Sequence, residues 1–101
     1  MDLILVGLSH KTAPIEIRER IAFPEEHLPT ALQQLQAESD LNEGMIVSTC
    51  NRVEILVHGR RGHFQIVEAV KNFLYSYHAL KPPFLENYLY SHLRHDDINH
   101  L

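Results

Sequence analysis

The order of strand-like and helix-like segments constrains the fold of this 101-residue chain more than any other feature of its sequence. Short apolar or alternating stretches predict strands, and longer stretches with apolar residues at helical spacing predict helices. Strands are expected at residues 3–8, 45–49, 53–58 and 84–93, and helices at residues 15–21, 28–37 and 65–77. This order predicts an α+β fold of the ferredoxin-like split βαβ type (βαββαβ), with a four-stranded antiparallel sheet and helices packed on one face.

Composition excludes several classes of function. The chain is 45% hydrophobic and has a formal net charge of -4, so it can bury the core of one domain but lacks the basic excess of a nucleic-acid or membrane surface. No apolar segment approaches the roughly 18 residues of a membrane span, and no secretory signal begins the chain. The single cysteine cannot form an internal disulfide. We therefore expect a cytoplasmic protein without a membrane partner.

The last residues, 96–101, have the pattern of a helix that has only begun. Asp96 or Asp97 would cap the helix, and Ile98 and Leu101 would start its apolar stripe. A native chain seldom stops one turn into a capped helix. We therefore expect this chain to be a piece of a longer protein, cut at the start of that helix.

Cys50 is the strongest candidate for a nucleophile in the chain. It lies in the short polar turn between two predicted strands, two residues before Arg52. A nearby fixed cation favours the thiolate, which is the reactive form of cysteine. A cysteine also serves as a small apolar residue in a core. Position alone leaves the nucleophilic and the inert interpretation equally open.

Two segments resemble signature motifs of the glutamyl-tRNA reductase family. Residues 7–14 (Gly-Leu-Ser-His-Lys-Thr-Ala-Pro), continued by residues 18–23 (Arg-Glu-Arg-Ile-Ala-Phe), are similar to the family's N-terminal signature. Residues 48–54 (Ser-Thr-Cys-Asn-Arg-Val-Glu) are similar to its active-site segment. Both occur in the family's order, and the resemblance runs from about residue 3 to the end of the chain. Residues 1–101 thus resemble the N-terminal catalytic, substrate-binding domain of such a reductase.

The resemblance implies a reaction on glutamate esterified to its tRNA. The Cys50 thiolate would attack the aminoacyl carbonyl, expel the tRNA and form a thioester. Hydride from NADPH would then release glutamate-1-semialdehyde, the first step of tetrapyrrole (porphyrin) biosynthesis from glutamate. A thioester accepts hydride more readily than an ester, so the nucleophile divides one difficult step into two. The family further implies a homodimer, contact with the aminomutase that takes the semialdehyde, and no metal.

The parts of the reductase that bind NADPH and form the dimer are expected to lie outside this chain. The sequence contains no Gly-rich dinucleotide fingerprint and is too short for an additional Rossmann domain. No residue of the chain is therefore expected to bind the cofactor. The fragment alone is not expected to complete the reduction.

The resemblance assigns catalysis to Cys50 and substrate contacts to Thr49, Cys50, Asn51 and Arg52. The Arg52 guanidinium is suited to hold the substrate's free carboxylate through a bidentate pair. Thr49 and Asn51 alternatively only shape the turn, and Arg52 is alternatively a solvated residue. For Glu54, the pattern predicts exposed strand surface, and an ion pair with an arginine is as open as a catalytic role.

Histidine supplies the second catalytic candidate. The family's functional histidine matches His100 best and His92 less well, and it would polarise the ester or protonate the departing ribose oxygen. His92, His95 and His100 lie near Asp96 and Asp97, but their spacing crosses from a strand end to a helix start. Common ligand geometry does not follow, and we expect no metal site.

Two other interpretations stay open. The chain is alternatively a non-catalytic ferredoxin-like regulatory domain in which Cys50 is incidental. It is alternatively an RNA-binding sheet module, which would need exposed aromatic residues and a basic groove that the central strands lack. Within the reductase interpretation, His10 has a structural or pocket-lining role rather than one in proton transfer. Lys11 and Arg18 shape the pocket or approach the tRNA end, with surface solvation as the alternative for these two.

Overall fold

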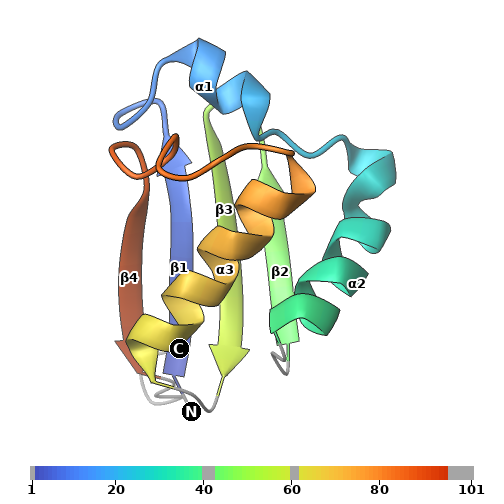
Figure 1. The fold of residues 1–101 in the computed structure, drawn as a ribbon, viewed down its shortest axis with the longest axis vertical. Coiled ribbons are helices and arrows are strands. Elements are labelled where there is room, and N and C mark those ends of the chain that lie inside the picture. The colour runs from blue at the N-terminus through green and yellow to red at the C-terminus, as the bar shows by residue number, and fades with distance from the viewer. Residues whose placement is uncertain (1, 40–42, 60–61, 96–101) are drawn as a thin grey trace.

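The computed structural model describes residues 2–39, 43–59 and 62–95. Its elements are β1 (Asp2–Ser9), α1 (Ile15–Arg20), a 3-10 turn η1 (Glu25–His27), α2 (Leu28–Ser39), β2 (Glu43–Ser48), β3 (Arg52–Gly59), α3 (His63–Tyr77) and β4 (Tyr90–His95). The strands form one antiparallel sheet in the order β2-β3-β1-β4 (Figure 1). This is the predicted ferredoxin-like split βαβ arrangement, so the fold class is confirmed.

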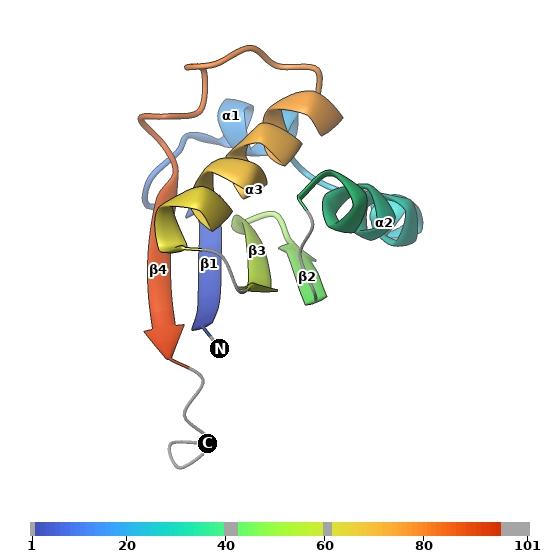
Figure 2. The ribbon, with the colours of Figure 1, turned by 60° about the horizontal axis from the view of Figure 1, so that its bottom comes forward.

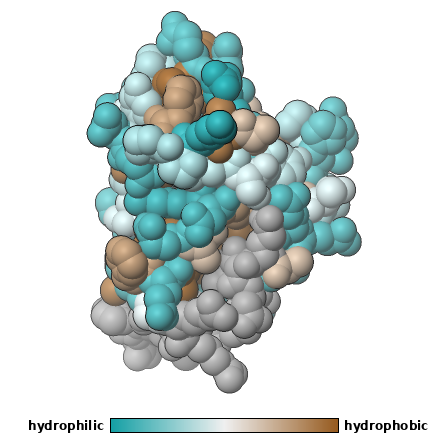
Figure 3. All heavy atoms as spheres, viewed as in Figure 1, coloured by the Kyte–Doolittle hydropathy of each residue, from teal (hydrophilic) through white to brown (hydrophobic). Residues whose placement is uncertain are grey.

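Helices α2 and α3 cover one face of the sheet, as the view in Figure 2 shows. The surface that they present to solvent is mostly hydrophilic, with scattered apolar patches (Figure 3). The short helix α1 lies instead at the end of the sheet where β1 stops and β3 begins (Figure 1). That end also holds the β2–β3 connection and the start of β4, so three segments distant in sequence meet there.

Strand β3 shows why the sheet has a buried and an open face. Val53, Ile55 and Val57 are at most 1% exposed and point toward the helices, while Glu54 and Leu56 point to the other face. Successive residues of a strand alternate between faces, and each large apolar side chain so buried contributes about 1.5–3 kcal/mol. The helices complete this core with Ala31, Leu35, Ile66, Val70, Phe73 and Leu74.

Helix α3 begins and ends through local hydrogen bonds. At its start, the side-chain oxygen of Gln65 accepts a hydrogen bond from the backbone N–H of Gly62 at 3.2 Å. Past its end, Ala79 adopts a positive φ of 55° and the N–H of Leu80 returns to the carbonyl of Tyr75 at 2.9 Å. A left-handed residue after the last turn is a common way to stop a helix. The helix thus ends at Tyr77, as the sequence pattern predicted.

The last predicted strand, residues 84–93, begins too early. Residues 82–88 form turns, and β4 starts only at Tyr90. The Tyr75 hydroxyl on α3 explains the difference, because it accepts a hydrogen bond from the backbone N–H of Leu85 at 2.9 Å. Leu85 itself is fully buried. This segment is therefore held against α3 rather than against the sheet.

Two further expectations concern the chain's ends and its relation to membranes. The helix start expected at residues 96–101 lies outside the described residues. Among the residues that are described, no helix is both long enough and apolar enough to cross a membrane, and the longest, α3, has 15 residues.

Candidate active site at the end of the sheet

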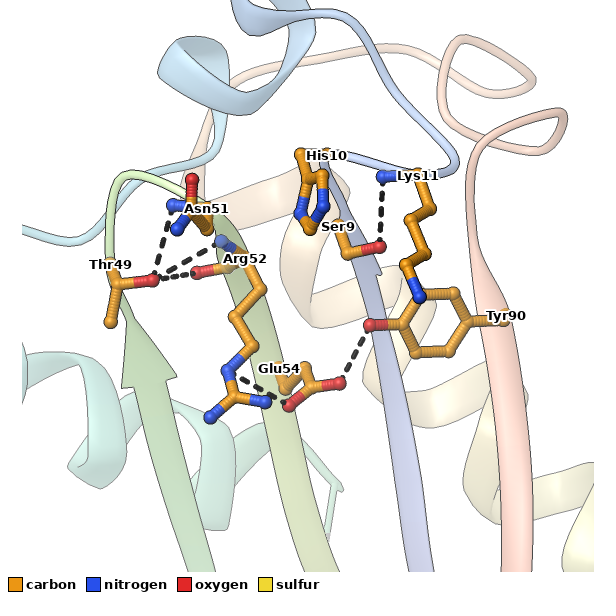
Figure 4. A pocket seen from close by; sticks show the side chains of 8 residues that line it. All are labelled: Ser9, His10, Lys11, Thr49, Asn51, Arg52, Glu54 and Tyr90. Carbon is orange, nitrogen blue, oxygen red and sulfur yellow. Dashed lines mark hydrogen bonds and ion pairs between the residues drawn. The ribbon is translucent and has the colours of Figure 1, made fainter.

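A pocket of about 540 Å³ opens at the end of the sheet where the three segments meet (Figure 4). Its walls come from the turn after β1, the β2–β3 loop with the adjoining part of β3, and the first residue of β4. The lining residues are Ser9, His10, Lys11, Thr49, Asn51, Arg52, Glu54 and Tyr90. The fold therefore brings together the two sequence segments that carry the motifs. Cys50 is exposed and is not itself among the lining residues, although its sequence neighbours Thr49 and Asn51 are.

The Thr49 side chain fixes the loop that presents Cys50. Its hydroxyl oxygen accepts hydrogen bonds from the backbone N–H groups of Asn51 and Arg52, each at 3.2 Å. The N–H of Thr49 also donates to the carbonyl of Arg52 at 2.8 Å. A side-chain oxygen that accepts from the next N–H groups is a standard turn device. Thr49 therefore shapes the turn, and it also lines the pocket.

Two elements outside the loop hold it in place. The Arg18 guanidinium, on α1, donates from Nε to the carbonyl of Cys50 at 3.1 Å and from Nη1 to the carbonyl of Ala13 at 2.8 Å. The N–H of His10 donates to the carbonyl of Asn51 at 2.8 Å. Arg18 thus places a fixed positive charge beside the Cys50 backbone. The sequence offered Arg18 only as a general pocket or surface residue, and its bond to Cys50 spans 32 residues.

Arg52 is the first residue of β3, and its side chain extends toward Glu54 on the open face of the sheet (Figure 4). Arg52 Nε lies 3.7 Å from Glu54 Oε1, which confirms an ion pair with this arginine. The Glu54 side chain is only 14% exposed, so it is more covered than the expected strand surface. The Tyr90 hydroxyl donates to Glu54 Oε2 at 2.6 Å.

Tyr90 is the site residue that sequence reasoning missed. The pattern only places it within the strand expected at residues 84–93, and no motif signals its hydroxyl. Burial, together with the Glu54 carboxylate, raises the pKa of Tyr90 to about 12. The hydroxyl therefore keeps its proton near neutral pH and remains a hydrogen-bond donor to Glu54.

The histidine candidates separate in the structure. His10 lines the pocket, whereas His92 lies on β4, exposed, with its ring centroid 5.4 Å from that of Tyr90. The first-choice catalytic histidine, His100, lies outside the described residues. Among the described side chains, no group of three or more histidine, cysteine or acidic residues could hold a metal ion.

Fold and pocket together define a class: a ferredoxin-like domain that presents an exposed thiol on a braced loop beside a polar pocket. The chain matches the family described as "Glutamyl-tRNAGlu reductase, N-terminal domain" over residues 6–101. The chain therefore belongs to this family, as its two motifs predicted.

Proteins named glutamyl-tRNA reductase from several bacteria are similar to the chain over its full length. Identity is 44% with the protein of Synechococcus sp. (strain RCC307), 45% with that of Pelobacter propionicus and 42% with that of Geobacter metallireducens. Each comparison covers 100% of this chain but 23% of the relative. The chain thus spans about a quarter of the length of these curated relatives.

Proposed function

We propose that this domain binds the glutamyl end of a charged tRNA and that Cys50 accepts the glutamyl group as a thioester. The observation that carries the proposal is the position of Cys50, exposed on a loop held by Thr49 and Arg18 beside a polar pocket. A nucleophile held in one geometry loses less entropy when it attacks. The relatives' names supply the substrate class.

The proposed step balances as an acyl transfer. The Cys50 sulfur forms a bond to the ester carbonyl carbon, the bond from that carbon to the ribose oxygen breaks, and the electron pair leaves with this oxygen. The ribose oxygen then takes up a proton. His100 or His92 remains the proposed donor of that proton or the group that polarises the ester.

Arg52 supplies the proposed recognition of the substrate's side-chain carboxylate. Its printed approach to Glu54, from Nε to Oε1 at 3.7 Å, is longer than a hydrogen bond, so the N–H donors of the guanidinium can still bind a ligand. The side chain is 56% exposed and borders the pocket. Two parallel N–H donors match the two oxygens of a carboxylate. Asn51 lines the same pocket and is proposed as a further substrate contact.

The reduction of the thioester belongs to parts of the protein outside this chain. A dinucleotide is usually held at a Gly-rich turn of a parallel βαβ unit, whereas this sheet is entirely antiparallel. The described residues do not fit NADPH, so no hydride step is derived from them. NADPH, the homodimer, the aminomutase contact and a cytoplasmic location are proposed for the longer protein from its family.

Trapping the acyl group tests the proposal. The full-length protein is incubated with glutamyl-tRNA labelled in the glutamyl group, without NADPH, and protein-bound label is counted after denaturation. We expect label in the parent and in Ser91→Ala, a matched control on exposed β4, and none in Cys50→Ser. Absence of label from the parent, or equal labelling of Cys50→Ser, contradicts the proposal.

Alkylation separates this function from a regulatory domain with an incidental cysteine. We expect Cys50 to react with iodoacetamide near neutral pH faster than a free peptide thiol. A rate equal to that of the peptide would favour the non-catalytic alternative.

A further inference from the structure

Glu54, Gly7 and Tyr90 form one row across three neighbouring strands. Glu54 on β3 is paired with Gly7 on β1, and Gly7 is paired on its other side with Tyr90 on β4. Directly opposed residues in an antiparallel sheet place their side chains on the same face. Glu54 and Tyr90 therefore stand on the open face with a strand between them, and they still meet at 2.6 Å.

Gly7 makes this contact across the strand possible. A Cβ atom added at Gly7 would lie 2.8 Å from Cγ of Glu54 and 2.4 Å from the carbonyl oxygen of Val53. Both distances are shorter than a carbon atom tolerates. The missing side chain leaves the space in which Glu54 crosses β1 and reaches Tyr90.

The bond to Tyr90 leaves one oxygen of Glu54 for Arg52. Tyr90 binds Oε2, and Arg52 Nε lies near Oε1 (Figure 4). An arginine on an exposed loop end has many rotamers, and ordering one in the free protein reduces the entropy lost on binding. The contact between Glu54 and the guanidinium is an ion pair at 3.7 Å, longer than a hydrogen bond, so the N–H donors of Arg52 stay available for a ligand.

We propose that Tyr90 is a positioning residue that, through Glu54, orients the Arg52 guanidinium to receive the carboxylate of the substrate side chain. The proposal rests on the proposed function, because it assumes that Arg52 contacts that carboxylate. It adds a role for Tyr90, for Glu54 and for the glycine between them. None of these three residues need touch the substrate for the effect.

Tyr90→Phe in the full-length protein tests the proposal by its selectivity. The rate of Cys50 acylation is measured against substrate concentration for glutamyl-tRNA and for the same tRNA carrying glutamine, whose amide replaces the carboxylate. We expect the half-saturating concentration of glutamyl-tRNA to rise roughly three- to tenfold with a maximal rate within about twofold of the parent. The glutamine ester should react as with the parent.

Tyr88→Phe is the matched control. Tyr88 is a half-buried tyrosine two residues earlier that packs against the core, and its hydroxyl has no hydrogen bond to another described residue. Its variant should leave both substrates unchanged. A general loss of packing would instead affect the two substrates equally, so the ratio between them separates positioning from structure.

Glu54→Gln tests the same positioning of Arg52 if Tyr90→Phe fails to fold. It keeps the side chain's size but removes the charge that faces Arg52, and we expect the same selective rise for glutamyl-tRNA. An unchanged half-saturating concentration in a folded variant, or an equal loss for both substrates, overturns the proposal. Labelling of Cys50→Ser overturns the proposed function instead, so the two failures are distinct.

Discussion

A tyrosine, a glutamate and a cation meet twice in this domain, once beside α3 and once at the end of the sheet. Beside α3, the Tyr75 hydroxyl donates to Glu86 Oε2 at 2.7 Å, and Lys71 Nζ contacts Oε1 at 3.0 Å. Lys71 also lies 3.5 Å from Glu68. Its charge is shared between two carboxylates, and the cluster joins the turn at residues 82–88 to the helix.

At the end of the sheet the same three groups are arranged more openly. The Tyr90 hydroxyl donates to Glu54 at 2.6 Å, while Arg52 lies at the longer distance of 3.7 Å from the other oxygen. Among the described residues, Arg52 has no second carboxylate partner. We propose that Lys71, which two carboxylates share, has a structural role, whereas Arg52, which borders the pocket, has a role in binding.

The largest effect on acylation should come from removing Arg52, the cation at the end of the sheet, and is compared with the removal of Lys71 beside α3. We expect Arg52→Ala to raise the half-saturating concentration of glutamyl-tRNA for Cys50 acylation about 100-fold, because a charge-assisted bidentate pair is lost. Lys71→Ala should leave this concentration unchanged. Acylation assays on the two full-length variants measure both concentrations. An equal effect of the two substitutions would contradict the different roles proposed for Arg52 and Lys71.

Tyr75→Phe should lower the stability of the fold without changing acylation, the opposite of Arg52→Ala. It removes the bond to Glu86 and leaves the buried N–H of Leu85 without its acceptor. We expect the free energy of unfolding to fall by about 1–3 kcal/mol, with Cys50 acylation unchanged. Urea unfolding measures the first quantity, and Tyr88→Phe is the control. A loss of acylation larger than the loss of stability would contradict the structural assignment.

Arg18→Ala separates the order of the loop from the recognition of substrate. Without the guanidinium, the carbonyl of Cys50 loses its donor from α1. We expect the maximal rate of acylation to fall about tenfold with little change in half-saturation, because the nucleophile is less well placed. Arg20→Ala, on the same helix, is the control. A change in half-saturation alone would assign Arg18 to substrate binding.

The smallest effect concerns acid stability. The hydrogen bond from Tyr75, followed by Lys71, lowers the pKa of Glu86 below its ordinary value of 4.5. A carboxyl with a lowered folded-state pKa stabilises the fold above its unfolded pKa and loses this contribution as the pH falls through the folded value. Glu86→Gln should therefore flatten the decline of stability below about pH 4.5. An unchanged decline would mean that the Glu86 carboxylate does not contribute to the acid sensitivity of the fold.

His78 produces a separate pH window that the same titration resolves. Burial against Phe23 and Tyr77 lowers the pKa of His78 to about 4. The unfolded chain then binds this proton more readily, so stability falls as the pH drops from 6.5 toward 4. His78→Phe should remove the part of the decline that lies in this window and leave that of Glu86.

Sequence patterns predicted the features that depend on neighbouring residues. The alternation of apolar and other residues at 53–58 predicted a strand that the structure confirms, with Val53, Ile55 and Val57 buried, because burial in a strand follows a period of two. The chemical role proposed for Cys50 comes from the resemblance of its motif to a family, since the local charge pattern left two interpretations open.

The remaining features depend on contacts between segments far apart in the chain. The row of Glu54, Gly7 and Tyr90 requires the register of three strands, which no local pattern contains. The early start predicted for the last strand was wrong because one hydroxyl, from Tyr75, binds the backbone of that segment. The Glu54–Tyr90 contact and the late start of β4 both depend on hydrogen bonds between different segments of the chain.

The most direct measurement is peptide mapping of the full-length protein after incubation with glutamyl-tRNA in the absence of NADPH. We expect a glutamyl adduct on the peptide that contains Cys50, labile to hydroxylamine as a thioester is. An adduct on any other residue, or none at Cys50 while the ester is consumed, would contradict acylation of Cys50.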